Sequence, residues 1–473
     1  MNLIWFRNDL RIHSNVALNA AIMQGPCRAI FLATPAQWQQ HDMAGCKQAF
    51  INRHVNELGV SLAGMGIELL VINCKNFAGQ VSWLTAYCAQ HAEATIFANE
   101  EIELNENKRD NTLKQLGLPL MLFESDVLVG KGKVLTANGQ MFKVFSAFKK
   151  SWLAIAKQQN FVATLPRYIS DSPTVYQSIE FIEKNHLAEK WPLASMVRSR
   201  LLPEFLLDKH QRYSEHRDYF AIKGTSGLSP YLAIGAIGIH EVVSLLLFYY
   251  PDVMQDDKHP QFSWLNELIW RDFYRHVLYQ WPNLIKGVSF NTRYAGLPWR
   301  NDTQAFQAWC NGQTGYPIID AAMRQLKRTG WMHNRLRMVV ASFLTKHLLI
   351  DWRWGEQYFM RHLIDGDFSA NNGGWQWAAG TGCDAQPYFR IFNPTAQSEK
   401  FDPNGEFIRM YVHELSDLPT KHLHFPHHYL KSNALSVDYP SPIVEHKAAR
   451  LRALAFYKEH VSSQKRVTTI ERF

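Results

Sequence analysis

Short apolar runs alternate with helical segments through the first 125 residues, and this alternation constrains the fold more than any other feature. The apolar runs are residues 3–6, 28–33, 68–72, 95–98 and 118–123, and the helical segments are residues 16–23, 46–65, 78–92 and 101–115. Unbroken apolar runs are typical of strands buried on both faces, so the order predicts a doubly wound parallel α/β sheet. A ligand of such a sheet is expected beyond the carboxyl ends of the strands. No glycine-rich dinucleotide or phosphate-loop motif follows any run.

The composition changes after this region. Residues 126–195 are richer in Gly, Lys, Ser and Pro, notably at 130–133 and 170–173. They predict a long surface connector with one helix near residues 145–158. From residue 196 to 473 the apolar period is near 3.6, which predicts an all-α domain. We therefore expect an α/β domain (1–125), a connector (126–195) and a helical domain (196–473).

The composition indicates which partner and which cellular compartment suit this protein. The 473 residues carry a formal net charge of +8, which favours a polyanionic partner, and 15 Trp, which is a base-stacking and redox side chain as well as a core one. The six cysteines form no Cys-x-x-Cys pair, which argues against a zinc ribbon and fits a reducing compartment. We find neither a secretory leader nor an apolar run long enough for a bilayer, so we expect a soluble cytoplasmic protein without a membrane partner.

The stretch from residue 331 to 377 carries the most unusual combination of side chains. Its first part predicts a buried helix from Trp331 to Ile350, with Asn334, Arg337 and Met338 on one face. A buried polar group without a partner costs about 1–3 kcal/mol. The downstream Asp and Asn pairs could supply those partners, and so could a polar ligand. The alternative is a satisfied core network with Asn/Gly turn chemistry.

Two earlier segments also carry polar groups in patterns that suit a ligand. Residues 223–229 form a loop of small residues before an apolar segment, which suits either a bound phosphate or an ordinary capping turn. Residues 264–276 predict a helix on which Glu267, Trp270, Arg271 and Tyr274 share a face. Glu267 and Arg271 could form a simple ion pair. With a nucleobase as ligand, the indole would stack and the acid would accept from a base edge.

Four histidines gather near the end of the chain, at positions 422, 424, 427 and 428. The carboxylates and cysteines that would complete a metal site are missing nearby, so we expect no metal.

These motifs together resemble the photolyase/cryptochrome flavoprotein family, and most closely its bacterial class I members that repair cyclobutane pyrimidine dimers. The resemblance covers nearly the whole chain, with matches at 5–11, 266–276, 314–317, 331–338, 365–377, 388–394 and 440–447. It implies an antenna-chromophore domain, a connector and a helical domain that binds FAD. The implied FAD contacts are Tyr213, Thr225, Ser226, Leu228, Ser229, Arg271, Asn334, Arg337, Asp365, Asp367 and Asn371. Relatives often carry Arg or Lys where this chain has Gly227, which should loosen one contact to the pyrophosphate.

The resemblance also assigns roles in the reaction. Asn371 matches the residue beside flavin N5, where plant receptor members carry an acid, and the resemblance implies that Asn371 and Glu267 are catalytic. Relatives specific for the (6-4) lesion carry two histidines at the positions of Asn334 and Met338, so this chain is expected to act on cyclobutane dimers. The implied lesion contacts are Arg217, Glu267, Trp270, Asn334, Arg335, Met338 and Trp377. The implied electron relay is Trp375, Trp352 and Trp299.

The second chromophore is implied by fewer residues. Asn105, Glu106 and Lys286 fall where folate-using relatives contact 5,10-methenyltetrahydrofolate. A deazaflavin, or no antenna at all, remains the alternative.

The expected activity is therefore light-dependent repair of DNA that contains pyrimidine dimers, by a monomeric lyase (a deoxyribodipyrimidine photolyase) without an obligate protein partner. Reduced FAD would pass one electron to a flipped dimer and receive it back. A blue-light photoreceptor without repair activity is the first alternative, and a dark flavin oxidoreductase is the second.

Overall fold

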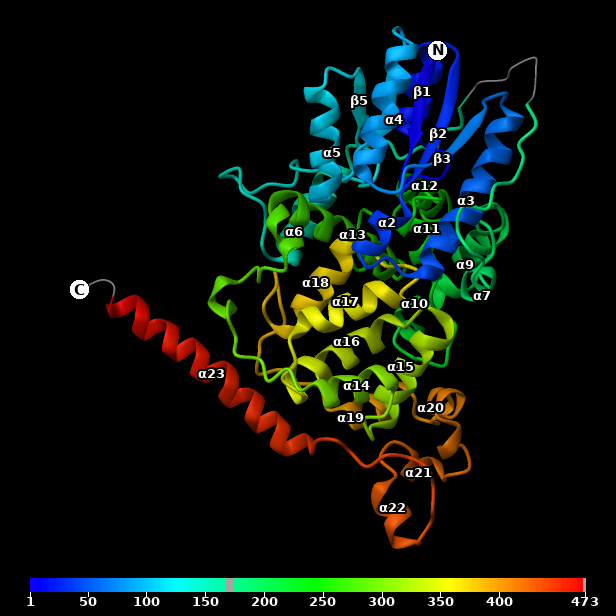
Figure 1. Ribbon diagram of the computed structural model, residues 1–473. Coiled ribbons are helices and arrows are strands. Elements are labelled where there is room, and N and C mark those ends of the chain that lie inside the picture. Colours follow the sequence, from blue (N-terminus) through cyan, green and yellow to red (C-terminus); the bar gives the residue numbers. More distant parts are fainter. Residues whose placement is uncertain (167–173, 471–473) are drawn as a thin grey trace. The chain divides into compact units, whose positions relative to one another are not determined.

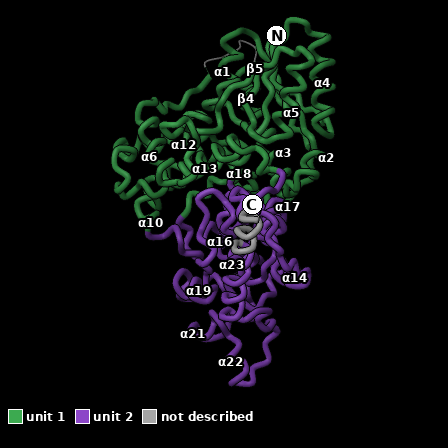
Figure 2. Tube along the Cα trace, turned by 90° about the vertical axis from the view of Figure 1, so that its left-hand side faces the viewer, with its two compact units in different colours: residues 1–214, 225–285, 364–369 green, residues 215–224, 286–363, 370–473 purple. Residues whose placement is uncertain are grey.

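The computed structural model describes residues 1–166 and 174–470. The chain divides into two compact units (Figure 2), of which unit 1 comprises residues 1–214, 225–285 and 364–369 and unit 2 comprises residues 215–224, 286–363 and 370–473. Each unit thus contains segments that are distant in the sequence. The three-part division made from the sequence remains a prediction, and its Ser/Pro segment 170–173 lies outside the described residues.

A five-stranded parallel sheet forms the N-terminal part of unit 1. Its strands are β1 (Asn2–Phe6), β2 (Cys27–Ala33), β3 (Leu69–Asn73), β4 (Ile96–Asn99) and β5 (Leu120–Phe123). Their spatial order is β3-β2-β1-β4-β5, with every pair parallel. The order reverses direction at β1, which makes the sheet doubly wound. The predicted α/β fold class is confirmed, with strand ends shifted by only a residue or two.

Helices connect consecutive strands of this sheet (Figure 1). They are α1 (Val16–Met23), α2 (Pro35–Gln40), α3 (Gly45–Gly64), α4 (Phe77–Gln90) and α5 (Leu104–Gln115). Helix α1 packs on β1 and β4, and α3 packs on β3. The four longer helices were predicted from the apolar period. Helix α2 was not, because a single short helix that begins at a proline has no periodicity to detect.

The rest of unit 1 is helical and irregular. Its helices are α6 (Phe145–Ala156), α7 (His186–Glu189), α8 (Ala194–Met196), the π-helix η1 (Val197–Leu201), α9 (Leu202–Leu207), the 3₁₀ helix η2 (Lys209–Arg212), α10 (Tyr213–His216), α11 (Ser229–Ala233), α12 (Ile239–Tyr249) and α13 (Phe262–Gln280). The predicted connector helix near residues 145–158 corresponds to α6.

Unit 2 is helical. Its elements are the 3₁₀ helix η4 (Thr292–Tyr294), α14 (Thr303–Asn311), α15 (Pro317–Thr329), α16 (Asn334–Ser342), the π-helix η5 (Phe343–His347), α17 (Trp352–His362), α18 (Phe368–Ala379), α19 (Pro394–Phe401), α20 (Glu406–Tyr411), the 3₁₀ helix η6 (His413–Leu415), α21 (Thr420–Leu423), α22 (His427–Ser432) and α23 (His446–Ile470). The 3₁₀ helix η3 (Pro282–Lys286) lies in unit 1 except for Lys286, and the first two residues of α18 also lie in unit 1. Trp309, Leu336, Phe343 and Trp352 lie in its hydrophobic core. The predicted all-α region is confirmed.

The predicted long helix from Trp331 to Ile350 is wrong in two respects. It begins at Asn334, because the His333 side chain accepts a hydrogen bond from the Arg335 N–H and caps it. After Ser342 the helix widens into the π-helix η5 and ends before Leu349, whose φ is 53°. The polar face was also expected to be buried, but Asn334 is exposed and Arg337 is half-buried. The apolar face opposite them fills the core.

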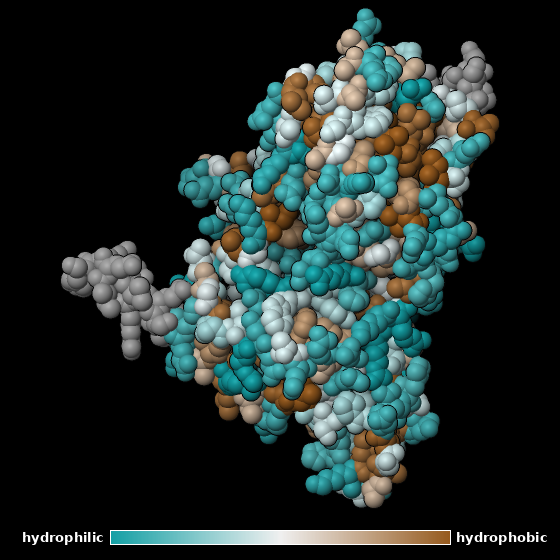
Figure 3. Space-filling view, in the orientation of Figure 1, coloured by the Kyte–Doolittle hydropathy of each residue, from teal (hydrophilic) through white to brown (hydrophobic). Residues whose placement is uncertain are grey.

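The surface mixes hydrophilic and hydrophobic side chains on the face shown in Figure 3. Scattered exposed apolar residues are normal for a folded chain. Within residues 1–166 and 174–470, no helix is both long enough and apolar enough to cross a membrane.

A buried carboxylate organises one end of unit 2. Asp320 on α15 is fully buried and accepts hydrogen bonds from the Thr314 N–H and hydroxyl, both at 2.7 Å, and from the Gly315 N–H at 3.1 Å. It also accepts from the Tyr439 hydroxyl at 2.6 Å. Burial raises the pKa of Asp320, and the hydrogen bonds from Tyr439 and Thr314 oppose that rise. One side chain thus holds two distant segments of the chain together.

We expect Asp320→Asn to lower the free energy of unfolding by about 2–3 kcal/mol, because an amide NH₂ would face donors that the carboxylate now satisfies. Denaturant titration measures the change. Asp302→Asn is the matched control, since Asp302 caps α14 and Asn caps a helix equally well. Equal losses in both variants would contradict this role of Asp320.

Candidate functional site

The polar face predicted for residues 264–276 exists on α13. Glu267, Trp270, Arg271 and Tyr274 are all half-buried, whereas Phe273 on the opposite side is fully buried. A 3.6-residue period places the four polar or aromatic groups on one side and the apolar groups on the other. The helix therefore presents an acid, an indole and a guanidinium at the edge of the core.

The Trp270 indole is held in a stack. Its ring lies 3.6 Å from the Phe145 ring of α6 with an interplanar angle of 7°, and 5.6 Å from the Tyr274 ring at 29°. Aromatic contacts of this kind fix the plane of a ring. Phe145, in the segment predicted to be only a connector, thus backs one face of the indole.

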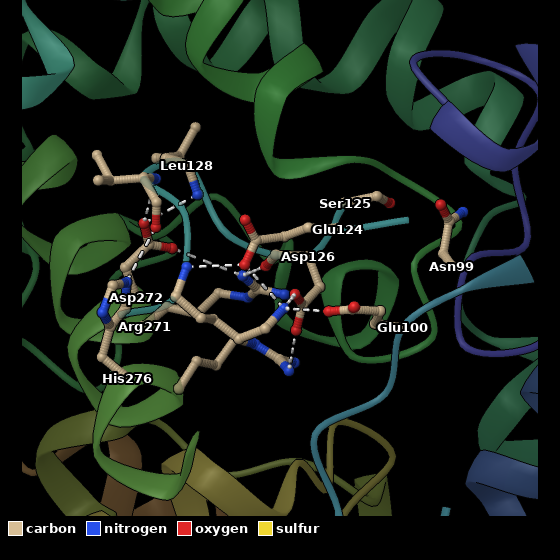
Figure 4. A network of polar contacts seen from close by, with 12 residues as sticks. Asn99, Glu100, Glu124, Ser125, Asp126, Leu128, Arg271, Asp272 and His276 are labelled. Atoms are coloured by element: carbon tan, nitrogen blue, oxygen red, sulfur yellow. Dashed lines mark hydrogen bonds and ion pairs between the residues drawn. The ribbon is translucent and has the colours of Figure 1, made fainter. Parts of the chain in front are cut away.

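Asp126 stands at the centre of a polar network beside α13 (Figure 4). Its carboxylate accepts from Arg275 Nη1 at 2.8 Å and from Lys131 Nζ at 3.0 Å, and its backbone carbonyl accepts from Arg271 Nη1 at 2.5 Å. Burial alone would raise the pKa of Asp126, but the positive charges of Arg275, Lys131 and Arg271 outweigh burial and lower it to about 2. Asp126 is therefore ionised at neutral pH.

Arg275 links this network to the acidic loop before α18. Its Nη2 donates to Asp367 at 2.7 Å, so the guanidinium lies between the carboxylates of Asp367 and Asp126. Burial would lower the pKa of Arg275, but those two carboxylates outweigh burial and raise it. The buried Lys47 donates to the Gly366 carbonyl of the same loop at 2.6 Å. The loop that carries Asp365 and Asp367 is thus held by two cations.

A second carboxylate ties the segment after β5 to the same helix. Asp272 Oδ2 accepts from the Leu128 and Val129 N–H groups and from Trp152 Nε1, at 2.9, 3.3 and 3.0 Å. His276 is hydrogen-bonded to the Val129 carbonyl at 2.9 Å. These contacts fix residues 126–129, and with them Asp126, against α13.

The small-residue loop lies in unit 1 from Thr225 onward. Thr225 and Ser226 are half-buried, Leu228 is buried, and Ser229 begins α11. Gly227, where charged residues were expected in relatives, has a φ of 67°. This left-handed conformation favours glycine, so the departure has a backbone reason. Tyr213, at the start of α10, is buried.

In unit 2, the first turns of α16 carry the predicted lesion and flavin contacts. Arg335 pairs with Asp218 at 2.5 Å, while Arg337 donates through Nε to the Met332 carbonyl at 2.9 Å. Both guanidinia are therefore held by the protein. Arg217, Arg335, Arg337 and Met338 are half-buried and Asn334 is exposed.

Helix α18 carries polar groups that fit a ligand. Asn371 donates through Nδ2 to the Glu356 carbonyl at 2.9 Å, which fixes the plane of its amide. Ser369 Oγ, Asn372 Nδ2 and Trp375 Nε1 are buried and have no hydrogen-bond partner among the described residues. Buried donors are expensive to leave unsatisfied, so their presence along one helix fits a polar group such as FAD.

The three indoles of the predicted relay lie on neighbouring backbone segments of unit 2. A Cβ at Gly355 of α17 would come within 2.1 Å of Trp375 Cη2, so only glycine allows this indole to pack there. Trp352 begins the same helix three residues earlier, on the side that carries Gly355. Trp299 directly precedes Arg300, whose N–H donates to the Leu349 carbonyl at 2.8 Å, close in sequence to Trp352.

Glu106 is largely buried, and its surroundings suit a residue that binds a ligand. Its side chain is 13% exposed, and its Oε2 is buried without a partner among the described residues. Burial, followed by the charges of Glu103 and Glu101, raises the pKa of Glu106 to about 8. The neighbouring Asn105 is hydrogen-bonded through Nδ2 to His41 at 3.0 Å. The pair fits the polar ring of a pterin, while Lys286 belongs to unit 2.

The chain matches two family models and many full-length relatives. The model described as "DNA photolyase" matches residues 2–167, and the "FAD binding domain of DNA photolyase" matches residues 264–459. The deoxyribodipyrimidine photo-lyases of Salmonella typhimurium and Escherichia coli are 44% and 42% identical, each over 97% of this chain and 98% of their own. The chain belongs to the DNA photolyase family. A class III photolyase from Agrobacterium tumefaciens has a similar structure, with a TM-score of 0.84, 31% identity and 97% of each chain covered.

The photolyase/cryptochrome resemblance, the enzyme class and FAD as the cofactor are thereby confirmed. The individual site residues stay predictions. Those in unit 1 are Tyr213, Thr225, Ser226, Leu228, Ser229, Glu267, Trp270, Arg271, Asp365 and Asp367 with Asn105 and Glu106, and those in unit 2 are Arg217, Lys286, Trp299, Asn334, Arg335, Arg337, Met338, Trp352, Asn371, Trp375 and Trp377. Within the described residues, no group of three or more His, Cys, Asp or Glu side chains is placed to hold a metal ion.

Three residues of this photolyase that the sequence did not single out hold the predicted flavin contacts. Arg275 lies one helical turn after Arg271 on α13, so the helix period could have pointed to it. Asp126 and Lys47 carry no such signal, because only tertiary folding brings them to Arg275 and to the acidic loop.

We expect Asp126→Asn to lower the free energy of unfolding of this photolyase by about 3 kcal/mol at neutral pH, because the buried Arg275 guanidinium loses one of its two carboxylate partners. The contribution of Asp126 is complete above its unfolded pKa of 3.8 and is lost as the pH falls through about 2. The difference between wild type and variant should therefore shrink in acid, which denaturant titration at several pH values measures.

The matched control is Glu100→Gln. Glu100 lies 3.6 Å from Lys131 Nζ in the same network, but its side chain is 40% exposed. Its removal should cost less than about 1 kcal/mol. A loss for Asp126→Asn that is as small as that of the control, or that does not change with pH, would contradict the burial argument.

Proposed function

We propose that this photolyase repairs cyclobutane pyrimidine dimers in DNA when it is illuminated. The observation that carries the proposal is the half-buried face of α13, with its acid and its fixed indole plate, in a chain 44% identical to a deoxyribodipyrimidine photo-lyase. We further propose that it acts in the cytoplasm as a monomer without an obligate protein partner, and that its three functional regions are residues 1–125, 126–195 and 196–473.

The chain's own residues bind and orient FAD in this proposal. The hydroxyls and amides of the 225–229 loop and Arg271 hold the pyrophosphate, and Asp367 accepts from a ring N–H or a ribose hydroxyl. Arg337 and Asp365 place charge beside the ring, and Asn371 presents an amide near N5. Bound FAD supplies the light absorption and the one-electron chemistry that splits the dimer. The protein contributes position, exclusion of water and charge.

The lesion is held by stacking and by its polar edges. Trp270 and Trp377 stack on the extruded dimer, and Glu267 and Asn334 bind its polar edge. Extrusion is less costly for a crosslinked dimer than for normal bases, because the dimer pairs and stacks poorly. Met338 completes the contact, where (6-4) enzymes carry histidine. Arg217 and Arg335 bind backbone phosphate, so affinity should fall with added salt.

Two further elements complete the proposal. Trp375, Trp352 and Trp299 pass an electron from the surface to oxidised cofactor. Asn105, Glu106 and Lys286 bind 5,10-methenyltetrahydrofolate as the antenna, with Glu106 as the acceptor for its pterin ring. A deazaflavin, or no antenna, is the alternative that extraction and absorption spectroscopy of the bound chromophores would reveal.

Repair is tested with a thymine-dimer oligonucleotide and fully reduced enzyme. Under blue or near-ultraviolet light we expect the ultraviolet absorbance of the restored pyrimidines to return, with many dimers repaired per protein molecule. A dark sample is the control. If no absorbance returns while the flavin is bound and fully reduced, the repair proposal fails.

The photoreceptor alternative is supported by one structural similarity. A cryptochrome from Synechocystis has a similar structure, with a TM-score of 0.81 at 28% identity. This alternative predicts a light-dependent change of the protein without dimer turnover. A dark flavin oxidoreductase instead predicts oxidation of NAD(P)H without light. The same oligonucleotide assay, run with and without light and NAD(P)H, separates all three functions.

Stacking by Trp270 makes a quantitative prediction. Trp270→Ala should weaken binding of dimer-containing DNA by about ten- to a hundredfold, since base–aromatic stacking contributes about 1–3 kcal/mol per base. Trp270→Phe keeps a ring and should lose much less. Trp83→Ala, on α4, is the control. Fluorescence anisotropy measures the affinity, and equal binding by Trp270→Ala and wild type would exclude the stacking role.

The raised pKa of Glu106 predicts that folate affinity depends on pH. Acceptance from a pterin by the ionised carboxylate releases the proton that burial keeps on Glu106, so folate affinity should rise as the pH approaches about 8. Glu106→Gln should bind folate about tenfold or more weakly and lose this pH dependence. Titration followed by folate absorbance measures both effects. The exposed Glu93→Gln is the control, and an unchanged pH profile in Glu106→Gln would refute the assignment.

A further inference from the structure

Trp352 lies in an environment that disfavours a positive charge on its ring. The side chain is fully buried at the start of α17. The guanidinium carbon Cζ of Arg353 lies over it, 4.6 Å from the ring centroid. Its Nε1–H has no hydrogen-bond acceptor among the described residues. A cation on the face of the ring is unusual for a residue proposed to lose an electron.

Arg353 is held over this ring from two sides. Its Nη1 donates to both carboxylate oxygens of Asp351, at 2.9 and 3.1 Å, and its Nε donates to the Gly287 carbonyl at 2.5 Å. The side chain is 36% exposed, whereas Asp351 is 17% exposed. Asp351 also caps α17 by accepting from the Arg353 N–H. The position of the charge is therefore set by the fold and not by chance contact.

Two effects raise the potential at which Trp352 can be oxidised. A guanidinium that attracts the neutral ring repels a ring that has lost an electron. The positive end of the α17 dipole, at which Trp352 lies, acts in the same direction. The negative charge of the Asp351 carboxylate offsets part of this rise in the oxidation potential of Trp352.

Trp299 and Trp375, the other two indoles of the proposed relay, differ from Trp352 in the charge near their rings. Within the described residues, no guanidinium or ammonium lies over the ring of Trp299 or Trp375. Trp299 is half-buried and packs against Phe456 and Tyr457, with ring centroids 5.4 and 6.2 Å away. Trp375 packs edge-on against Phe359 at 5.0 Å and Trp309 at 6.1 Å. The cation is thus specific to the middle indole.

We propose that Arg353 and Asp351 together set the oxidation potential of Trp352, so that the electron vacancy passes through this indole without resting on it. The inference rests on the proposed tryptophan relay. One electron moves from Trp352 to oxidised Trp375, and one moves from Trp299 to oxidised Trp352. The oxidant at the inner end is photoexcited oxidised flavin, and a thiol in solution reduces Trp299. Trp352 keeps its N–H proton throughout. Arg353 and Asp351 are positioning residues, since neither exchanges an electron.

The test uses two substitutions of opposite sign in the FAD-loaded protein, followed by transient absorption of the tryptophan radicals. Arg353→Gln makes Trp352 easier to oxidise, so transfer from Trp299 to Trp352 should slow about three- to tenfold, the factor expected for one cation–π contact. Asp351→Asn leaves Arg353 uncompensated and keeps the helix cap, so the same step should become faster. Arg353→Lys retains the charge and should stay near wild type.

Arg328→Gln is the matched control. Its guanidinium also lies over an aromatic ring, that of Tyr411 at 5.2 Å, outside the relay. It should leave the relay kinetics unchanged. Loss of a merely structural contact would change Arg353→Gln and Asp351→Asn in the same direction and would overturn the inference, as would unchanged kinetics in both. A wild-type protein that binds flavin but forms no tryptophan radical would instead overturn the proposed relay itself.

Discussion

A guanidinium buried between two carboxylates is the interaction on which the candidate site in unit 1 depends. Arg275 joins Asp126, which follows the last strand of the sheet, to Asp367, which precedes α18. The guanidinium alone would be costly to bury, and the two half-buried carboxylates offset that cost. The segments that they join are far apart in the sequence, so one side chain fixes both the end of the sheet region and the acidic loop. Arg271, on the same helix, is held by the same Asp126.

Unit 2 depends on close packing more than on charge. Gly355 lets the Trp375 indole lie directly against α17, and the fully buried Trp352 begins that helix. The backbone N–H of Arg300 donates a hydrogen bond to the Leu349 carbonyl, which brings Trp299 close to the start of α17. Three indoles on neighbouring segments are a consequence of this packing. Their electronic difference comes from one exposed edge of the helix, where Arg353 and Asp351 place charge beside only the middle ring.

Polar groups in this protein fall into two classes that burial alone does not distinguish. Asp320 is buried, accepts hydrogen bonds on both carboxylate oxygens from Thr314, Gly315 and Tyr439, and serves the fold. Ser369 and Asn372 are buried with donors that have no partner among the described residues. Glu106 is similar, with an oxygen that nothing in the described chain binds. A bound chromophore would supply the missing partners of Ser369, Asn372 and Glu106, which lie at or near the residues predicted to bind FAD and the antenna.

The sequence by itself determined the order of strands and helices, the polar face of α13 and the family, because these depend on local periodicity and on ordered motifs. It misjudged α16, where a histidine cap and a π-helix replaced the expected uniform helix, since neither changes the apolar period. Only the tertiary structure revealed Asp126 beside Arg275, Lys47 beside the acidic loop, Phe145 behind Trp270 and Arg353 over Trp352. The first three are contacts between distant segments, and the last depends on which way a side chain turns at a helix start. Periodicity records which face a residue occupies, but the partner on that face is decided by the fold.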